Sequence, residues 1–257
     1  MPLLMPHSLQ QMQNIHREEL EAHFGPLGRQ AHAIRPDIRL LFVGFTNRCG
    51  SNYVCEALAS GGRLNLGEEF YNAGTILANC RDRGLDSVGA FTAMLIEERS
   101  MNGWLVAKLA VEHLAILTEI GLLDQILDRS HFMLVQRADR LAQAISLAIA
   151  VQNDRWSDAQ PARIPDTALV YDGPAIASIM EGLTNANGLF DRFFGLNGLV
   201  PHIVTYEQFV RMPEAVLGDI AAVLGITEFA VMPRAVRMRP QGGAVNAEWR
   251  ARFLAQR

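Results

Sequence analysis

Short apolar segments of strand length alternate with helical segments along this chain, and this alternation constrains the fold more than any other feature. The first strand is expected at 38–43, a mostly apolar run that ends at Gly44 and has the length of a buried strand. Further strands are expected at 103–109, 131–135 and 202–205. Helical patterns occupy 54–59, 87–98, 111–120, 139–153, 174–195, 213–224 and 247–254. The alternation predicts an α/β fold with a central parallel sheet that helices cover on both faces.

The 257 residues are enough for one domain with a sizeable core. Residues 1–36 are polar and rich in Gln, His and Glu, and a helix is expected at 8–23, before a break at Gly25 and Pro26. No internal repeat or linker divides the rest of the sequence. We therefore expect an N-terminal helical arm at 1–36, appended to the core, and a single domain at 37–257.

Composition and charge exclude several classes of protein. The chain is 49% hydrophobic, which is too apolar for a disordered protein. Its net charge of -4 argues against nucleic acid as a partner, because binding to a phosphate backbone needs a basic face. No apolar run approaches the roughly 18–20 residues of a membrane span, so we expect no integral membrane segment.

Targeting and metal-binding signals are also not expected. The first residues lack the basic and apolar regions of a signal peptide. The three cysteines, Cys49, Cys55 and Cys80, have no metal-ligand spacing and are typical of a reducing compartment. The seven histidines are scattered. These features predict a cytoplasmic protein without a metal site.

The turn after the first strand is the strongest local signal for a binding site. Unpaired N–H groups at a helix N-terminus attract anions, and Gly50 allows the backbone to approach a ligand closely. Ser51 and Asn52 carry side-chain donors, and Arg48 adds a positive charge. The alternative is an ordinary turn with a solvent-facing arginine. A Walker A loop is disfavoured, because Gly44 and Gly50 are separated by five residues where that motif has four, and no lysine follows Gly50.

A second signal is Arg137, which follows the strand expected at 131–135. The carboxyl ends of parallel strands form the rim at which α/β sheets bind ligands. Ser146 lies about two turns along the next helix, on a side that can face this rim. The alternative is a surface arginine paired with a nearby aspartate, together with a buried helix serine.

Lys108 is the single lysine beside 22 arginines, and it stands in an apolar strand. An unpaired ammonium group in such surroundings is costly to bury. We therefore expect Lys108 to reach an anion or a carboxylate at the end of its strand. The alternative is a lysine that extends to solvent at the sheet edge.

Several short motifs follow one another in an order that one enzyme family shares. They are Arg48-Cys49-Gly50-Ser51-Asn52, Glu69-Phe70-Tyr71, Gly103-Trp104 through Lys108, Arg137-Ala138-Asp139 through Gln143-Ala144-Ile145-Ser146, Val151-Gln152 with Trp156, Tyr206-Glu207, and Asn246-Ala247-Glu248-Trp249. Each motif is short, and the ordered set is what is specific. Over residues 38–257 the chain resembles the PAPS-dependent sulfotransferases of the bacterial trehalose 2-sulfotransferase type.

This resemblance implies the fold and the reaction. The fold would be an α/β, P-loop-NTPase-like three-layer sandwich with a central parallel sheet flanked by helices, and 37–257 would be one sulfotransferase domain. The sulfuryl donor would be 3′-phosphoadenosine 5′-phosphosulfate (PAPS), and adenosine 3′,5′-bisphosphate (PAP) the product. The acceptor would be a hydroxyl of a carbohydrate or glycolipid. The family also implies a homodimer.

The resemblance also assigns roles to residues. Glu69 would be the general base. The alternative is that Glu68 and Glu69 are a solvent-exposed acidic pair without a catalytic role. Lys108 would contact the transferring sulfuryl group or the acceptor, and Arg48 would neutralise the 5′-phosphosulfate. Residues expected to bind the nucleotide are Arg48, Cys49, Gly50, Ser51 and Asn52 at the 5′ side, Arg137 and Ser146 at the 3′-phosphate, and Arg239 in a C-terminal arginine cluster.

Two residues depart from the family pattern. Cys49 replaces a loop serine and Asn52 replaces a loop threonine. Backbone N–H groups still allow the loop to hold a phosphate, and an amide side chain can also donate. Two other functions stay open: a P-loop-type kinase or phosphotransferase that uses ATP, and a non-catalytic nucleotide-binding homologue.

Overall fold

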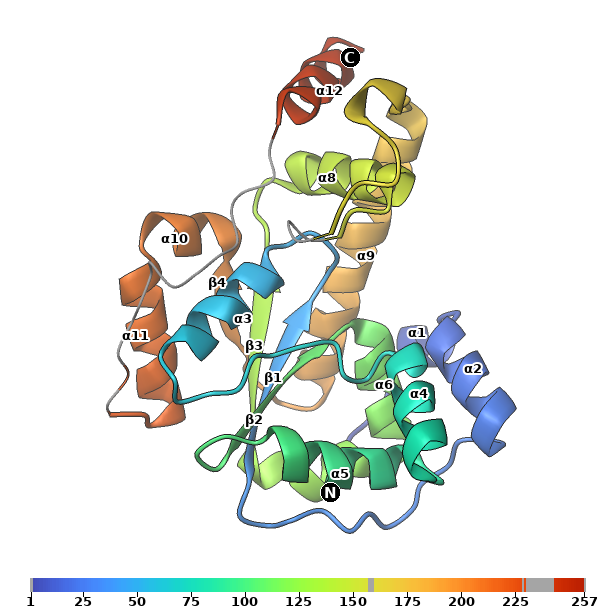
Figure 1. The fold of residues 1–257 in the computed structure, drawn as a ribbon, viewed down its shortest axis with the longest axis vertical. Coiled ribbons are helices and arrows are strands. Elements are labelled where there is room, and N and C mark those ends of the chain that lie inside the picture. Colours follow the sequence, from blue (N-terminus) through green and yellow to red (C-terminus); the bar gives the residue numbers. More distant parts are fainter. Residues whose placement is uncertain (1, 157–159, 228, 230–242, 257) are drawn as a thin grey trace.

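The protein folds around a four-stranded parallel sheet (Figure 1). The computed structural model describes residues 2–156, 160–227, 229 and 243–256. The strands are β1 (Arg39–Phe45), β2 (Trp104–Leu109), β3 (Ser130–Gln136) and β4 (His202–Thr205), in the order β2-β1-β3-β4. All four predicted strands are confirmed.

Helices connect the strands and flank the sheet (Figure 1). Their bounds are α1 (His7–Gln10), α2 (Ile15–Phe24), α3 (Ser51–Ser60), α4 (Ala73–Arg83), α5 (Val88–Arg99), α6 (Val111–Glu119), α7 (Leu122–Ile126), α8 (Arg140–Asn153), α9 (Gly173–Leu196), α10 (Tyr206–Arg211), α11 (Pro213–Leu224) and α12 (Ala244–Ala255). The predicted helices correspond to α3, α5, α6, α8, α9, α11 and α12. No helix in the described part of the chain is long and apolar enough to cross a membrane.

The central strand β1 supplies side chains to both faces of the sheet, because successive residues of a strand point in opposite directions. Leu40 and Phe42 belong to a core that includes residues of α4, α5, α6 and α9. Leu41 and Val43 belong to a second core that includes residues of α3 and α11. Layers of helix, sheet and helix therefore enclose two apolar cores, which confirms the predicted three-layer α/β sandwich.

The carboxyl ends of the three longer strands lie at the same edge of the sheet. Gly44 in β1 pairs with Leu109 in β2 and with Leu134 in β3, and all these pairings are parallel. The helices α3, α6 and α8 begin shortly after these strand ends. The turns that carry the predicted site residues are consequently neighbours in space.

The N-terminal segment is helical, but it differs from the expected single helix at 8–23. It forms α1 and α2, and Asn14 caps α2 by accepting a hydrogen bond from the Arg17 N–H. The Asn14 side chain also donates to the Glu112 carbonyl at 3.0 Å. Leu9 and Leu20 are buried in the core on the α6 side of the sheet. The segment is therefore packed against the domain by apolar contacts that its polar composition did not predict.

A third apolar cluster joins α8, α9 and α12 above the carboxyl edge of the sheet (Figure 1). Trp249 of α12 is buried there beside Ile145 and Ile176. This cluster packs α8 against α9 and α12, although it lies outside the two cores that sandwich the sheet.

Sequence reasoning missed α4, α7 and α10. The helices α7 and α10 are 5 and 6 residues long, which is too short for a clear helical period. For α4 the boundary signals were present, since Asn72 caps its first turn and Gly84 ends it in the left-handed conformation.

Candidate functional site

The turn between β1 and α3 has the geometry of an anion site. Gly50 has a φ of 95°, and a Cβ atom at this position would overlap the Tyr206 ring. Arg48 also has a positive φ, of 64°. Among the described residues no side chain caps the N-terminus of α3, and its first turn contains no acidic residue. The N–H groups of this turn and the helix dipole therefore favour an anion.

Cys49 and Ser51 stabilise this turn from the inside. The Cys49 side chain is buried in the core beneath α3, and its N–H donates to the Thr46 carbonyl at 3.1 Å. Burial raises the pKa of the Cys49 thiol, so the side chain is neutral at physiological pH. Ser51 is also buried. The replacement of a loop serine by Cys49 therefore changes a core contact and leaves the outer face of the turn to the backbone.

Lys108 lies at the centre of a polar cluster at the end of β2. Its side chain is 3% exposed, and its Nζ donates to Oε1 of Glu69 at 2.8 Å and to Oδ1 of Asn52. The Nζ also lies 4.3 Å from the centre of the Phe45 ring. The expectation that Lys108 reaches a carboxylate is confirmed, and the alternative of a solvent-extended lysine is wrong.

The segment before Glu69 is attached to the outer edge of β2. Asn65 imitates a neighbouring strand: its amide accepts from the Val106 N–H at 2.7 Å and donates to the Val106 carbonyl at 3.0 Å. The Lys108 N–H donates to the Glu68 carbonyl at 2.9 Å. These bonds carry Glu69 to Lys108, while 41% of the Glu69 side chain stays exposed. Sequence reasoning missed Asn65, because nothing local indicates that its amide substitutes for a strand.

A second polar cluster joins the same turn to α8. Arg48 Nε donates to Oγ of Ser146 at 3.0 Å, and its Nη1 donates to the Trp156 carbonyl at 2.8 Å. Arg137 Nη1 donates to the Arg48 carbonyl at 3.4 Å. Within the described part of the chain, Arg137 Nε is buried and has no hydrogen-bond partner. The predicted residues Arg48, Arg137 and Ser146 are thus brought together.

Gln143 links α8 to the β1–α3 turn through side-chain hydrogen bonds. It is completely buried, and its Nε2 donates to Oγ1 of Thr46 at 2.9 Å and to the Asn47 carbonyl at 2.8 Å. A buried amide whose hydrogen bonds are made within the protein has a structural role. Gln143 therefore fixes the spacing between the Arg48 turn and the helix that carries Ser146.

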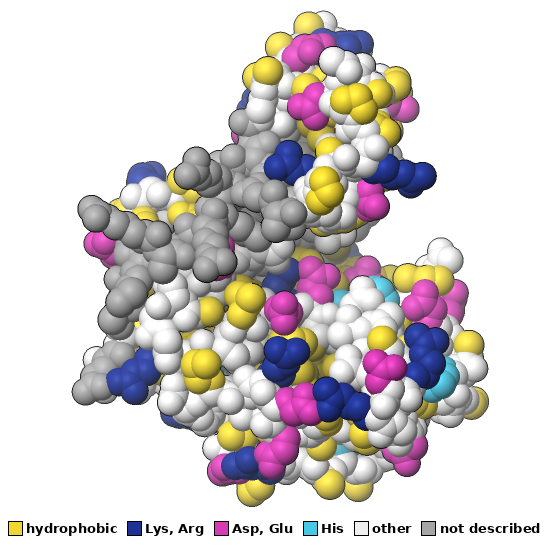
Figure 2. Space-filling model, in the orientation of Figure 1, with side chains coloured by type: hydrophobic (Ala, Val, Ile, Leu, Met, Phe, Trp, Pro, Cys, Tyr) yellow, Lys and Arg dark blue, Asp and Glu magenta, His cyan; other side chains and the backbone are white. Residues whose placement is uncertain are grey.

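A cavity of about 160 Å³ lies beside the Arg48 cluster. Arg48, Ser146 and Arg155 line it together with residues of α8 and with Gly243 and Asn246 at the start of α12. The surface is also indented between the part formed by α8, α9 and α12 and the larger lower part (Figure 2). The predicted nucleotide-binding residue Arg239 lies outside the described residues.

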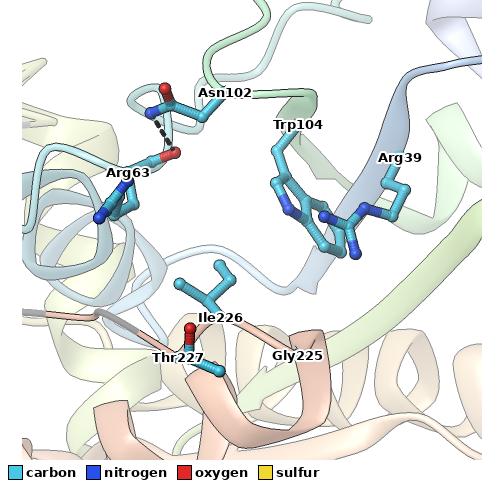
Figure 3. A pocket seen from close by; sticks show the side chains of 7 residues that line it. All are labelled: Arg39, Arg63, Asn102, Trp104, Gly225, Ile226 and Thr227. Carbon is cyan, nitrogen blue, oxygen red and sulfur yellow. Dashed lines mark hydrogen bonds between the residues drawn. The ribbon is translucent and has the colours of Figure 1, made fainter.

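Another cavity, of about 210 Å³, lies at the opposite, amino edge of the sheet (Figure 3). The Arg39 guanidinium lies over the Trp104 ring, 4.2 Å from its centre, at the beginning of β1 and β2. Asn102 donates to the Arg63 carbonyl at 3.2 Å. None of the predicted site residues lines this cavity.

The β1–α3 turn lies between the two polar clusters and contributes one residue to each. Arg48 at one side of the turn joins the α8 cluster, and Asn52 at the other side joins Lys108 and Glu69. In the described residues no group of three or more His, Cys, Asp or Glu side chains is arranged to hold a metal ion. Fold and site together define a P-loop-like α/β protein in which the β1–α3 turn stands beside a lysine–carboxylate pair.

Comparison with known families agrees with this class. Residues 103–256, which are more than half of the chain, match the Stf0 sulphotransferase family. The chain therefore belongs to the Stf0 sulphotransferase family, and the predicted resemblance is confirmed. The match contains Lys108, Arg137 and Ser146, whereas the β1–α3 turn and Glu69 precede it. No curated protein matches the chain.

Proposed function

We propose that this sulfotransferase transfers the sulfuryl group of PAPS to a hydroxyl of a carbohydrate or glycolipid. The observation that carries the proposal is the joining of Asn52, Lys108 and Glu69 into one hydrogen-bonded cluster beside an uncapped helix N-terminus. Sulfuryl transfer needs an anion-binding cradle next to a group that accepts a proton, and these residues supply both.

The residues present fit a nucleotide with two anionic ends. The α3 N-terminus would hold the 5′-phosphosulfate through backbone N–H groups. Arg137 would hold the 3′-phosphate with Ser146, and its buried Nε, which has no partner among the described residues, supports this role. An arginine suits this task because its planar donors bind a phosphate in bidentate fashion and stay charged. The bound donor would supply the activated sulfuryl group.

The orientation of Arg48 changes its expected role. Its guanidinium contacts Ser146 and the Trp156 carbonyl, on the α8 side of the turn. This direction favours binding of the 3′-phosphate, and it leaves Lys108 as the cation nearest to the predicted base. We therefore propose that Arg48 acts in nucleotide binding and that Lys108 acts on the transferring group.

Glu69 would accept the proton of the acceptor hydroxyl. Its 41% exposed side chain is open to an acceptor, while its Oε1 is held by Lys108. An anionic donor group close to Lys108 would compete with Glu69 for the Lys108 ammonium group and would free the carboxylate for the acceptor when both substrates are present.

The remaining proposals rest on the family resemblance and on composition. A carbohydrate or glycolipid acceptor and a homodimer follow from the resemblance alone. A cytoplasmic location is supported by the three cysteines, which are free and buried.

Calorimetry and a transfer assay test the proposal. We expect PAP to bind and ATP to bind far more weakly; binding of ATP without binding of PAP would point to a phosphotransferase. In the assay, labelled sulfate from PAPS should appear on at least one sugar of a panel. No transfer despite PAP binding would indicate a non-catalytic homologue.

The Glu69→Gln variant tests the base. It keeps the shape of the side chain and removes the proton acceptor, so transfer should fall by about 10²–10⁴-fold, with PAP affinity nearly unchanged. Glu68→Gln is the matched control, because Glu68 is an exposed neighbour. Equal rates in the wild type and Glu69→Gln would overturn the assignment.

A further inference from the structure

We infer that Glu207 of α10 is a positioning residue that holds Arg137 in place for the nucleotide phosphate. This inference rests on the proposed role of Arg137. The juxtaposition behind it is unexpected, because Glu207 lies 68 residues from the amide group that it binds at Asp139. Two adjacent residues, Tyr206 and Glu207, contact both sides of the candidate nucleotide site.

The Glu207 carboxylate binds two successive backbone amides directly after Arg137. Its Oε2 accepts from the Ala138 N–H at 2.9 Å, and its Oε1 accepts from the Asp139 N–H at 3.1 Å. Both oxygens are used, so the carboxylate fixes the direction in which the chain leaves β3. Since Arg137 precedes these amides, its backbone position is set by Glu207.

Glu207 is ionised in this position. Burial opposes ionisation, but the hydrogen bonds from the Ala138 and Asp139 amides outweigh it and lower the pKa of Glu207. The positive end of the α8 dipole also favours a carboxylate here. The negative charge of Glu207 therefore faces the two amides before α8 and also attracts the Arg137 guanidinium group.

Tyr206 completes the arrangement from the other side. Its ring lies beneath the Arg137 guanidinium, whose Cζ is 5.0 Å from the ring centre. The same ring fills the space in which Gly50 would carry a Cβ atom. The contacts leave Arg137 Nε buried and without a partner among the described residues. Arg137 is thus held by its backbone, by its ring contact and by the bond from its Nη1 to the Arg48 carbonyl, while its Nε is left for a ligand.

Glutamine at position 207 would preserve the shape and lose the function. Its amide has one oxygen that can accept from one N–H, while its NH2 group would face the other N–H. The turn would then relax and Arg137 would move. Glu214→Gln on α11 is the matched control, because it removes the same charge from an exposed position.

Calorimetry with two nucleotides provides the test. PAP carries a 3′-phosphate and AMP does not, so their affinity ratio reports what Arg137 contributes. In Glu207→Gln this ratio should fall on the order of 10- to 100-fold, the cost of a small misplacement of a positioning group, while AMP affinity and the Glu214→Gln control stay near the wild type. An unchanged ratio in Glu207→Gln would overturn the inference. If the wild type itself does not distinguish PAP from AMP, the proposed role of Arg137 fails instead.

A double-mutant cycle shows whether Glu207 acts through Arg137. In an Arg137→Ala background, Glu207→Gln should have no further effect on PAP affinity, whereas independent, additive effects would contradict a positioning role. Hydrogen exchange in the wild-type protein covers the case in which Glu207→Gln does not fold. The Ala138 and Asp139 amides should be protected before any nucleotide is added, and rapid exchange of both would overturn the inference.

Discussion

Two helix N-termini face the candidate site, and the protein treats them in opposite ways. At α3 no side-chain cap and no acidic first turn is found among the described residues. At α8 the Asp139 side chain caps the Ala142 N–H at 3.0 Å, and Glu207 binds the two preceding amides. The α8 terminus is therefore satisfied by carboxylates of the protein itself, whereas the α3 terminus keeps its donors for a ligand.

In the proposed function, this difference gives one sheet edge both an anion-binding terminus and a terminus whose backbone is held by the protein's own carboxylates. Both termini attract negative charge through their dipoles and unpaired amides. Arg250 of α12 adds to the closure of α8, since its Nη1 lies 2.9 Å from each Asp139 oxygen. In the proposed function, the satisfied terminus supports Arg137 and Ser146, and the open terminus of α3 holds the anionic donor.

Between the two termini, the largest expected effect on transfer concerns the lysine that faces the open terminus. Lys108→Arg keeps the charge, but a guanidinium group is broader than an ammonium group and has to fit among Phe45, Asn52 and Glu69. Transfer should fall by about 100-fold or more, the size of effect that follows loss of one donor to a developing charge. Steady-state transfer assays measure this, with Arg137→Lys for comparison at the supporting side. A Lys108→Arg rate equal to that of the wild type would show that Lys108 is no part of the reaction.

The next effect concerns the shape of the open terminus. Gly50→Ala places a Cβ at positive φ and against the Tyr206 ring, so the loss in free energy of unfolding should be roughly 2–5 kcal/mol. PAP binding should be lost as well.

Gly62→Ala is the matched control, because Gly62 also has a positive φ, of 67°, yet no atom lies within 4 Å of its Cβ position. Its cost should be about 1–2 kcal/mol, with PAP affinity unchanged. Urea unfolding and calorimetry separate the two, and equal losses in both variants would mean that the Tyr206 contact is unimportant.

The smallest effect concerns the pH dependence of the satisfied terminus. The folded-state pKa values of Asp139 and Glu207 lie below the ordinary values of 3.8 and 4.5. A depressed carboxyl pKa contributes stability that is fully present above the ordinary value and is lost as pH falls through the folded value. The difference in unfolding free energy between the wild type and Glu207→Gln should therefore be constant above about pH 5.5 and should shrink in more acidic solution. Its plateau should be about 2 kcal/mol, the scale of hydrogen bonds to a charged group. Urea unfolding across pH measures it, and a difference that grows on acidification would contradict the assignment.

Much of the fold could be predicted from the sequence, because the strands and the longer helices carry local signals. The apolar run in β1 and the helical period in α8 are properties of neighbouring residues. The burial of the N-terminal segment was not visible in this way. Leu9 and Leu20 look isolated in a polar stretch, and only packing against the core on the α6 side buries them.

The sequence predicted which residues gather at the candidate site better than it predicted which of them bond to each other. Lys108 needed a polar partner because of its apolar surroundings, and Glu69 is that partner. The direction of Arg48 toward Ser146 could not be read from the sequence, because the two residues are 98 positions apart. The contribution of Asn65 to the edge of β2 was hidden for the same reason.

By itself, the sequence determined which residues can form strands and helices, and therefore that Arg48, Lys108 and Arg137 lie near the ends of parallel strands at one sheet edge. It also determined that the single lysine could not stay unpaired in an apolar strand. The tertiary structure alone decided which helix N-terminus stays open and which is closed by Glu207. The reason is physical: local periodicity follows from residues a few positions apart, whereas the bond between Glu207 and Asp139 spans 68 residues and exists only once β3 and β4 have paired.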